Sequence, residues 1–333
     1  MATVGLHPQP EIDVEFHGQF LTFIVPAADG CNLSCSFCLI RQRGEVTGKY
    51  LRPEDFARFV REAAERSPIF AVSIQGHEPL LPASLPYTQA VLATGRFLGL
   101  PTAMVTNGVL LADTLDLLAA LAPSKIAISL DAAVADDHDR IRGMPGAWAA
   151  TVVGIRQAVK VLRPQTRLAV SSVLLPGKRY LLEGMPARLR EIGIDRWIIN
   201  PLLRVGREQV GGPVGDRARL FGDFLILQEV ANRAGVRLTV DDEFGHLGHD
   251  TARPELRSLD VRTLPPNVKI FRLAPGGQCS IGDGILRQVT LDTPCWRPGV
   301  SHAGDFLESL SQSLVPLTSA HAGHCTDVPV MTV

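Results

Sequence analysis

The chain lacks both a strong excess of one charge and any long hydrophobic segment. Its 33 Lys and Arg and 34 Asp and Glu leave a net charge of −1, whereas nucleic-acid-binding proteins normally carry a marked basic surplus. No apolar run approaches the roughly 20 residues that span a bilayer, and residues 1–19 have no apolar core typical of a signal peptide. We therefore expect a cytoplasmic protein that binds neither nucleic acid nor a membrane.

Cysteine is absent from the whole middle of the chain. A length of 333 residues fits about two domains, or one barrel with an appendage, and the cysteine-free gap helps to locate the boundary between them. Six cysteines flank the gap in two groups of three: Cys31, Cys35 and Cys38, then Cys279, Cys295 and Cys325.

The first group has the spacing C-x3-C-x2-C and directly follows an apolar run. Three thiolates on one loop can converge on a soft metal, and an iron–sulfur cluster is the natural candidate. Zinc normally takes four N or S ligands, and no fourth lies nearby; disulfide bonds cannot use three cysteines evenly. Because most cubane clusters have four cysteine ligands, a set of three leaves one iron open to bind and reduce another molecule.

Apolar runs alternate with helical patterns up to residue 202, and no Gly-x-Gly-x-x-Gly opens the first helix. Strands that alternate with helices of about 10–15 residues indicate parallel β/α units, and six units are too few for a full eight-stranded barrel. The sequence therefore predicts an α/β fold with a partial (β/α)6, TIM-like barrel. Strands are expected at 20–25, 69–75, 102–105, 125–130, 168–175 and 197–202, helices at 53–66, 86–98, 112–121, 146–162 and 180–192, then a helix at 216–234 and a strand at 236–240.

The β/α rhythm ends after residue 243. Two consecutive prolines and scattered charges indicate a linker, and short alternating strands then predict β-hairpins followed by a helix at about 305–315. The expected organisation is a leader at 1–19, a barrel at 20–243, a linker at 244–271 and a small hairpin-and-helix domain at 272–333.

The octet from Cys31 to Cys38, with Phe37 before the last cysteine, resembles the signature of the radical S-adenosylmethionine (radical SAM) superfamily. The resemblance implies that Cys31, Cys35 and Cys38 hold a [4Fe-4S] cluster whose open iron binds SAM. It also implies that SAM is cleaved reductively to a 5'-deoxyadenosyl radical, which abstracts a substrate hydrogen. An electron donor such as flavodoxin or ferredoxin would supply the electron, and the partial barrel is the architecture that the resemblance implies.

Other segments at the ends of predicted strands are similar to segments that hold SAM in this superfamily. Gly76-His77-Glu78-Pro79 resembles its Gly-Gly-Glu-Pro segment, whose backbone and acid hold the SAM amino group, with His77 in place of the second Gly. A simple turn that ends in Pro is the alternative. Three further candidates for the SAM site lie at neighbouring strand ends: Thr106 and Asn107 in a Thr-Asn-Gly turn, and Leu174 near adenine.

The segment from Ser129 to Asp131, with the later Asp139-x-x-Arg142-Gly143, resembles segments of peptide- and cofactor-maturing radical SAM enzymes. The resemblance implies a ribose contact for Ser129 and a contact with the SAM carboxylate for Arg142, whose planar guanidinium meets a carboxylate bidentately. A surface role for Arg142 stays equally open. Asp131 is the candidate catalytic acid or base. His138 is expected in a loop without a functional role, and Asn200 could face the substrate.

The second cysteine group resembles a shortened SPASM or Twitch extension of radical SAM enzymes. The resemblance implies at most one auxiliary iron–sulfur cluster, ligated by Cys279, Cys295 and Cys325, with a nearby histidine or the substrate as fourth ligand. The alternative is that these are unrelated thiols in a tail without a cluster.

Such extensions often accompany radical SAM enzymes that modify ribosomally made peptides by crosslinks, thioethers or epimerisation, so we expect a peptide substrate. Trp296 follows the Pro-Cys pair where anaerobic sulfatase maturases carry Asp, which disfavours that activity. Two alternatives stay open. One is a radical SAM dehydrogenase or lyase acting on a small molecule such as an aminosugar or cofactor precursor, and the other is a non-catalytic iron–sulfur or zinc-binding scaffold.

Overall fold

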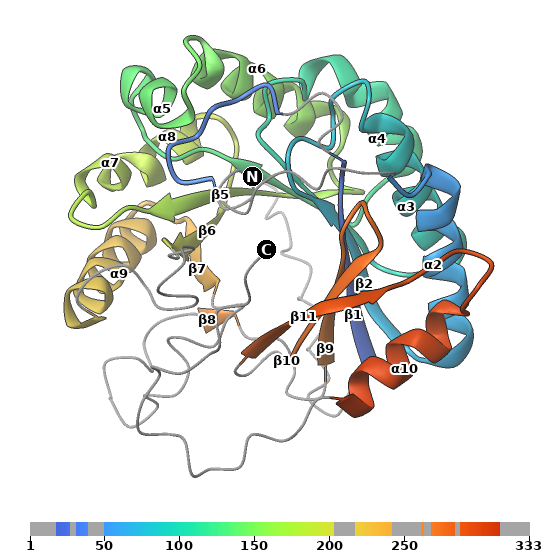
Figure 1. Cartoon of the computed structure of the whole chain (residues 1–333). Coiled ribbons are helices and arrows are strands. Elements are labelled where there is room, and N and C mark those ends of the chain that lie inside the picture. Colours follow the sequence, from blue (N-terminus) through green and yellow to red (C-terminus); the bar gives the residue numbers. More distant parts are fainter. Residues whose placement is uncertain are drawn as a thin grey trace.

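The described strands form one curved sheet, with helices on its outer face (Figure 1). Strands β1 to β8 are parallel and lie side by side in chain order. The strands are β1 (Gly18–Ile24), β2 (Ile69–Gln75), β3 (Thr102–Thr106), β4 (Lys125–Ser129), β5 (Arg167–Leu174), β6 (Arg196–Pro201), β7 (Arg237–Asp241) and β8 (Val261–Arg262). The computed structural model describes residues 18–26, 31–38, 50–202, 217–241, 261–262, 268–283 and 287–313.

Helices return the chain from each of β1 to β6 to the next strand. The longest of them cover the outer face of the sheet, and α2 begins at Pro53, whose fixed φ suits a first helical turn. The helical segments are α2 (Pro53–Arg66), α3 (Leu85–Phe97), η1 (Ala112–Thr114), α4 (Leu115–Leu121), α5 (Ala135–Arg142), α6 (Ala147–Val161), α7 (Tyr180–Glu183), α8 (Met185–Glu191) and α9 (Arg217–Arg233).

The predicted α/β fold with a partial, TIM-like barrel is confirmed, and the six predicted strands match β1 to β6 within two residues. Each of β1 to β6 is followed by a helix, as the six predicted β/α units require, and the further strand predicted at 236–240 is β7. Strand β8, which pairs with β7 in the same parallel sheet, is not predicted. With only two residues, β8 is too short to show any hydrophobic period. It lies in the segment that the sequence predicts as a linker.

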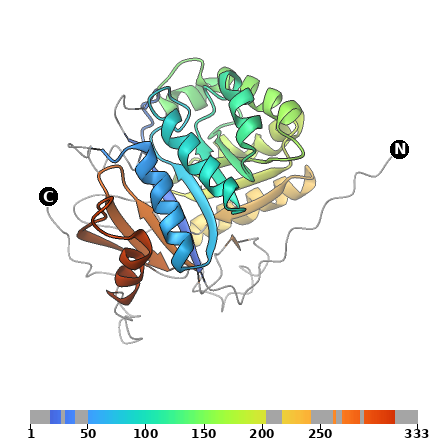
Figure 2. The ribbon, with the colours of Figure 1, turned by 90° about the vertical axis from the view of Figure 1, so that its right-hand side faces the viewer.

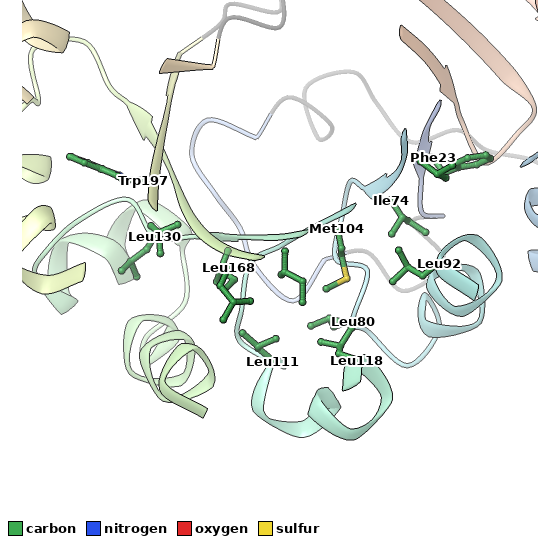
Figure 3. Packing of buried hydrophobic residues seen from close by; sticks show 14 of the residues in the cluster. Phe23, Ile74, Leu80, Leu92, Met104, Leu111, Leu118, Leu130, Leu168 and Trp197 are labelled. Carbon is green, nitrogen blue, oxygen red and sulfur yellow. The ribbon is translucent and has the colours of Figure 1, made fainter. Parts of the chain in front are cut away.

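The main core lies between the sheet and the helices. Alternate residues of each strand point to opposite faces, so Phe23, Ile74 and Met104 pack toward the helices, where Leu92 of α3 and Leu118 of α4 meet them (Figure 3). The opposite face of β3 to β6 carries a smaller cluster that lines the interior of the barrel: Val105, Ala127, Ala169 and Ile198.

The sequence does not predict helix α5. Five of its eight residues are charged, so it has no apolar periodicity, and its buried residues are His138, Ile141 and Arg142. The prediction that His138 lies in a loop is therefore wrong. Contacts with the cysteine loop, described below, hold this helix in place.

The C-terminal segments continue the sheet beyond β1. Strand β9 (Val268–Leu273) pairs in parallel with β1, and β10 (Gln278–Asp283) and β11 (Arg287–Cys295) form an antiparallel hairpin next to it. The predicted boundary at residues 271/272 falls inside β9. The predicted leader up to residue 17 and most of the predicted linker lie outside the described residues.

Helix α10 (Ala303–Ser313) lies beside α2 in both views (Figures 1 and 2). The Glu62 carboxylate accepts a hydrogen bond from the Ala303 backbone N–H at 2.7 Å, at the first turn of α10. Buried Trp296 meets Phe59 of α2 edge to face, with ring centroids 5.1 Å apart. The hairpin and helix therefore pack on the barrel. Among the described residues, no helix is long and apolar enough to cross a membrane.

Candidate functional site

The cysteine loop, Cys31 to Cys38, follows β1 at the C-terminal end of the parallel strands, where β/α barrels carry their chemistry. All three of its thiols are free and partly buried. The backbone N–H of Ser34 donates to the Arg142 carbonyl at 2.9 Å, and that of Ser36 donates to the Ile141 carbonyl at 3.1 Å. The end of α5 therefore holds the loop through its backbone.

Gly143, the residue after α5, allows the cysteine loop to come this close. Its φ is +68°, and a Cβ at this position would lie 2.7 Å from the Ser34 carbonyl oxygen, well inside van der Waals contact. Asp139 of the same segment accepts hydrogen bonds from the backbone N–H groups of Gly146 and Trp148 at 2.6 and 2.7 Å, at the start of α6. The Asp-x-x-Arg-Gly segment therefore forms the surface on which the cysteine loop packs.

The guanidinium of Arg142 lies between Cys35 and Asp131. Its Nη1 donates to the Cys35 Sγ at 3.7 Å, and its Nη2 pairs with the Asp131 Oδ2 at 2.6 Å. The charge also lies over the Phe37 ring, 5.5 Å from the centroid. Burial alone would lower the pKa of Arg142, but Asp131 and Cys35 raise it, so the guanidinium stays charged.

The buried Asp131 carboxylate has its contacts within the protein. Besides the ion pair, its Oδ1 accepts a hydrogen bond from the Val173 N–H at 2.8 Å. The Asp131 backbone N–H donates to the His138 Nδ1 at 3.1 Å, which requires this nitrogen to be unprotonated. Burial lowers the pKa of His138 to about 4. His138, for which the sequence predicts no role, thus holds the backbone at Asp131.

Glu78 is completely buried, and both of its oxygens accept hydrogen bonds. Oε1 accepts from the Leu80 N–H at 2.9 Å and from the Thr106 hydroxyl at 2.7 Å, and Oε2 accepts from the Asn107 N–H at 2.7 Å. Burial raises the pKa of Glu78, and these three donors oppose that rise. The carboxylate therefore joins the end of β2 to the end of β3.

The turn before Glu78 points a backbone carbonyl at the cysteine loop. Gly76 and His77 both have left-handed φ values, 85° and 36°, and the carbonyl oxygen of His77 lies 3.5 Å from the Cys31 Sγ. The carbonyl of Pro79 accepts a hydrogen bond from the Thr88 hydroxyl at 2.8 Å, which ties the turn to α3. A left-handed conformation at a non-glycine residue costs about 1–2 kcal/mol, so the fold holds His77 in place against this strain.

Ser129 and Leu174 are not among the residues gathered at the cysteine loop. Ser129 ends β4 and pairs in register with Ser171, whose hydroxyl accepts a hydrogen bond from the Asn200 Nδ2 at 2.8 Å. Leu174 is buried in the core that faces the helices. Its neighbour Val173 packs in the cluster that contains Phe37, so strand alternation favours Val173 as the residue that faces the site.

The three loop thiols fit an iron–sulfur cluster by their chemistry. Burial raises the pKa of Cys31 and of Cys35, and the guanidinium of Arg142 opposes that rise at Cys35; metal binding would deprotonate these thiols. The buried Nε of Arg142 has no hydrogen-bond partner in the described part of the chain, as expected beside an additional anionic group. Among the described residues, no three His, Cys, Asp or Glu side chains are already gathered around one point.

The late cysteines have a different setting. Cys279 of β10 lies in the main hydrophobic core, and burial raises its pKa to about 12. Cys295 pairs through its backbone with Gln278, next to Cys279; its side chain and all of Cys325 lie outside the described residues. Of the two alternatives that the sequence leaves open, these surroundings favour an unrelated thiol at Cys279.

Residues 25–180 match the family model of the radical SAM superfamily. This segment contains the cysteine loop, the Glu78 turn, Asn107 and Arg142. It is a radical SAM domain. The superfamily is one of enzymes that use a [4Fe-4S] cluster and SAM, so the cofactors expected from the cysteine loop agree with this match.

Curated relatives match about a third to a half of the chain. The AdoMet-dependent heme synthase of Methanosarcina barkeri is 34% identical over 128 residues, which are 38% of this chain and 35% of that protein. The GTP 3',8-cyclase 2 of Mycobacterium tuberculosis is 36% identical over 110 residues, 32% of this chain and 30% of that protein. The chain thus spans about a third of the length of these two relatives.

Solved structures share the fold over more of the chain. Streptococcus suis SuiB bound to its precursor peptide SuiA superposes with a TM-score of 0.62 at 15% identity, and covers 87% of this chain and 64% of SuiB. The structure of anSMEcpe with bound AdoMet and a peptide superposes with a TM-score of 0.57 at 16% identity, over 86% of this chain and 78% of that chain. At this identity the likeness shows the fold alone.

Proposed function

We propose that the chain is an enzyme that holds a [4Fe-4S] cluster on Cys31, Cys35 and Cys38, cleaves SAM reductively and abstracts a hydrogen from its substrate. The observation that carries this proposal is the cysteine loop itself, pinned at the C-terminal end of the barrel inside a radical SAM domain. The bound cluster would supply the electron that cleaves SAM, and the protein would bind, orient and shield the reactants.

The contacts of the site support different roles for Arg142, Asp131 and Phe37. Arg142 places a fixed positive charge beside Cys35, and Asp131 and Phe37 hold its guanidinium in place. Because the Asp131 carboxylate is buried and paired, we now propose a positioning role for it instead of acid or base catalysis. The orphaned Nε of Arg142 is the group we assign to the SAM carboxylate.

We propose that the turn at residues 76–79 also binds SAM. Its backbone, at Gly76 and His77, would meet the SAM amino group, since the His77 carbonyl already faces the cysteine loop. Glu78 and Thr106 would hold that turn from inside, because their mutual hydrogen bond is buried. Ser129 remains the proposed ribose contact.

A ribosomally made peptide is the substrate we propose. The support is the fold similarity to SuiB with its precursor peptide, which covers 87% of this chain and so extends beyond residues 25–180. Flavodoxin or ferredoxin is the proposed electron donor.

A small-molecule substrate is the second candidate. The curated relatives that match at 34–36% identity are named as a heme synthase and a GTP 3',8-cyclase, both of which act on small molecules by their names. Their identity to this chain is higher than that of SuiB, but their match covers no more than 38% of the chain.

The test is anaerobic incubation of the iron-loaded protein with SAM and a strong reductant, followed by quantification of 5'-deoxyadenosine. We expect release by the wild type, and its loss in the Cys35→Ser variant. Cys279→Ser is the matched control, a cysteine outside the loop, and should keep the release. Iron-loaded wild-type protein that neither binds SAM nor releases 5'-deoxyadenosine would instead identify the non-catalytic scaffold.

The substrate class is tested by supplying candidates labelled with deuterium. Transfer of deuterium into 5'-deoxyadenosine from a peptide would support the peptide proposal. Transfer from a labelled small molecule, with none from any peptide screened, would favour the second candidate.

A further inference from the structure

Asn107, at the end of β3, is fixed by hydrogen bonds on almost every polar group it has. Its Oδ1 accepts from the Val109 N–H at 2.9 Å, its backbone N–H donates to the Glu78 Oε2 at 2.7 Å, and its carbonyl accepts from the Thr151 hydroxyl at 3.1 Å. Because the Val109 N–H requires an oxygen acceptor, these contacts decide which way the side-chain amide points. The Nδ2 therefore faces the cysteine loop.

The two hydrogens of that nitrogen have two acceptors in the cysteine loop. Nδ2 lies 2.7 Å from the Asn32 Oδ1 and 3.9 Å from the Cys31 Sγ. The Asn32 Oδ1 is itself 3.8 Å from the same sulfur. If Asn107 served only to form the turn, the hydrogen bond between its Oδ1 and the Val109 N–H would be explained. The position of its Nδ2 beside the Cys31 sulfur would not be explained.

We propose that Asn107 is a positioning residue for Cys31 as a cluster ligand, an inference that rests on the proposed function. Its amide holds the loop through Asn32 and donates an N–H to the sulfur. Hydrogen bonds to ligand sulfurs set the reduction potential of a cluster. This N–H stabilises the more negative, reduced cluster and so raises the potential.

Glu78 takes part in this inference through Asn107. Its buried carboxylate fixes the Asn107 backbone and the Thr106 hydroxyl. Arg142 provides a second, charged N–H donor, to the Cys35 sulfur. Two loop sulfurs therefore have side-chain donors, one from the end of β3 and one from the end of α5.

The test compares Asn107→Asp with Asn32→Asp, because each adds one negative charge at the same bridge. In Asn32→Asp the Asn107 amide keeps both of its donors. In Asn107→Asp the Asn32 amide can turn and donate to the new carboxylate, so the bridge is kept while a carboxylate oxygen replaces the Asn107 N–H beside the Cys31 sulfur. Asn232→Asp, at an exposed position of α9, controls for charge added elsewhere.

The measurement is an anaerobic redox titration of the iron-loaded variants, followed by electron paramagnetic resonance. We expect both bridge variants to titrate at more negative potentials, and Asn107→Asp to lower the reduced fraction at least tenfold further than Asn32→Asp, about 59 mV for one electron. Asn232→Asp should titrate as the wild type. Loss of iron from folded Asn107→Asp alone would also support the positioning role.

Equal shifts of the reduction potential in the two bridge variants, or equal loss of iron from both, would overturn the inference, because the added charge alone would then explain the effect. No shift in either variant would also overturn it, because the Asn107 N–H would then have no effect on the potential. Release of 5'-deoxyadenosine by the wild type keeps the two proposals apart. Equal shifts in a protein that releases it refute only the role of Asn107, whereas an iron-loaded wild type without release refutes the proposed function.

Discussion

At the scale of single residues, the close packing of the cysteine loop on the end of α5 depends on Gly143, which has no Cβ. Gly143→Ala combines a left-handed φ of +68° with a clash against Ser34, whereas Gly146→Ala has a φ of +82° and nothing within 4 Å. The shared backbone cost is about 1–2 kcal/mol, and the clash adds about 1–3 kcal/mol more. We predict that Gly143→Ala is the more destabilised in urea unfolding and retains less iron. Equal behaviour of the two variants would contradict the close approach.

His138 makes the stability of the protein depend on pH. Because burial lowers its folded pKa from 6.5 to about 4, the neutral form is favoured in the native state and the unfolded chain binds the extra proton. Its contribution is complete above about pH 6.5 and is lost as the pH falls toward 4. About 2.5 pKa units correspond to about 3 kcal/mol.

His138→Asn tests this dependence, since the Asn carbonyl can replace Nδ1 as acceptor of the Asp131 N–H without titrating. The groups nearby that also act on His138 are Asp131, Arg142 and Asp139, and the variant keeps all three. Urea unfolding between pH 7 and pH 4 should show a flatter loss of stability in the variant. Parallel curves for variant and wild type would rule out His138 as the source.

At the scale of elements, the C-terminal hairpin and α10 are held to the barrel through Trp296. Its indole is 1% exposed and packs on Phe59 of α2. Truncation of such a side chain costs about 3–5 kcal/mol, so Trp296→Ala should be strongly destabilised. Phe97→Ala removes a ring that is 86% exposed, and it should change stability by no more than about 0.5 kcal/mol. Thermal or urea unfolding of both variants checks this, and a small loss in Trp296→Ala would mean that the extension packs loosely.

The strands and long helices were predictable from sequence because their apolar periods are local. The sequence does not predict two elements that depend on tertiary contacts. Strand β8 has only two residues, too few to show a period, and the charged helix α5 is held by the cysteine loop. Which residue of the Val173-Leu174 pair faces the site depends on how β5 is turned in the sheet, which the sequence does not show; Val173 packs in the cluster that contains Phe37, and Leu174 in the main core.

In the candidate site, too, local patterns were predictable from sequence and long-range contacts were not. The spacing of Cys31, Cys35 and Cys38 is a local pattern, and it pointed to the domain that the family match shows. The roles of Asn107 and His138 depend on partners far away in sequence, such as Glu78 and Asp131, so no spacing rule could have found them. The auxiliary cluster expected at Cys279 rested on resemblance to SPASM and Twitch tails, and the burial of Cys279 in the core is a tertiary property that the sequence does not show.

At the scale of the whole molecule, one iron–sulfur cluster accounts for the ligands that the structure describes. We predict about four irons per chain after anaerobic reconstitution, unchanged in Cys279→Ser. Chemical iron and sulfide analysis measures this. About eight irons, falling to about four in Cys279→Ser, would show that the auxiliary cluster exists and that Cys279 is one of its ligands.

The central claim is that the cysteine loop holds a cluster with an open iron to which SAM binds. Electron paramagnetic resonance of the reduced, iron-loaded protein, recorded with and without SAM, tests this most directly. We predict a cluster signal whose shape changes when SAM is added and which is absent from a variant with Cys31, Cys35 and Cys38 all replaced by Ala. A signal that SAM leaves unchanged, or that persists in the triple variant, would contradict the claim.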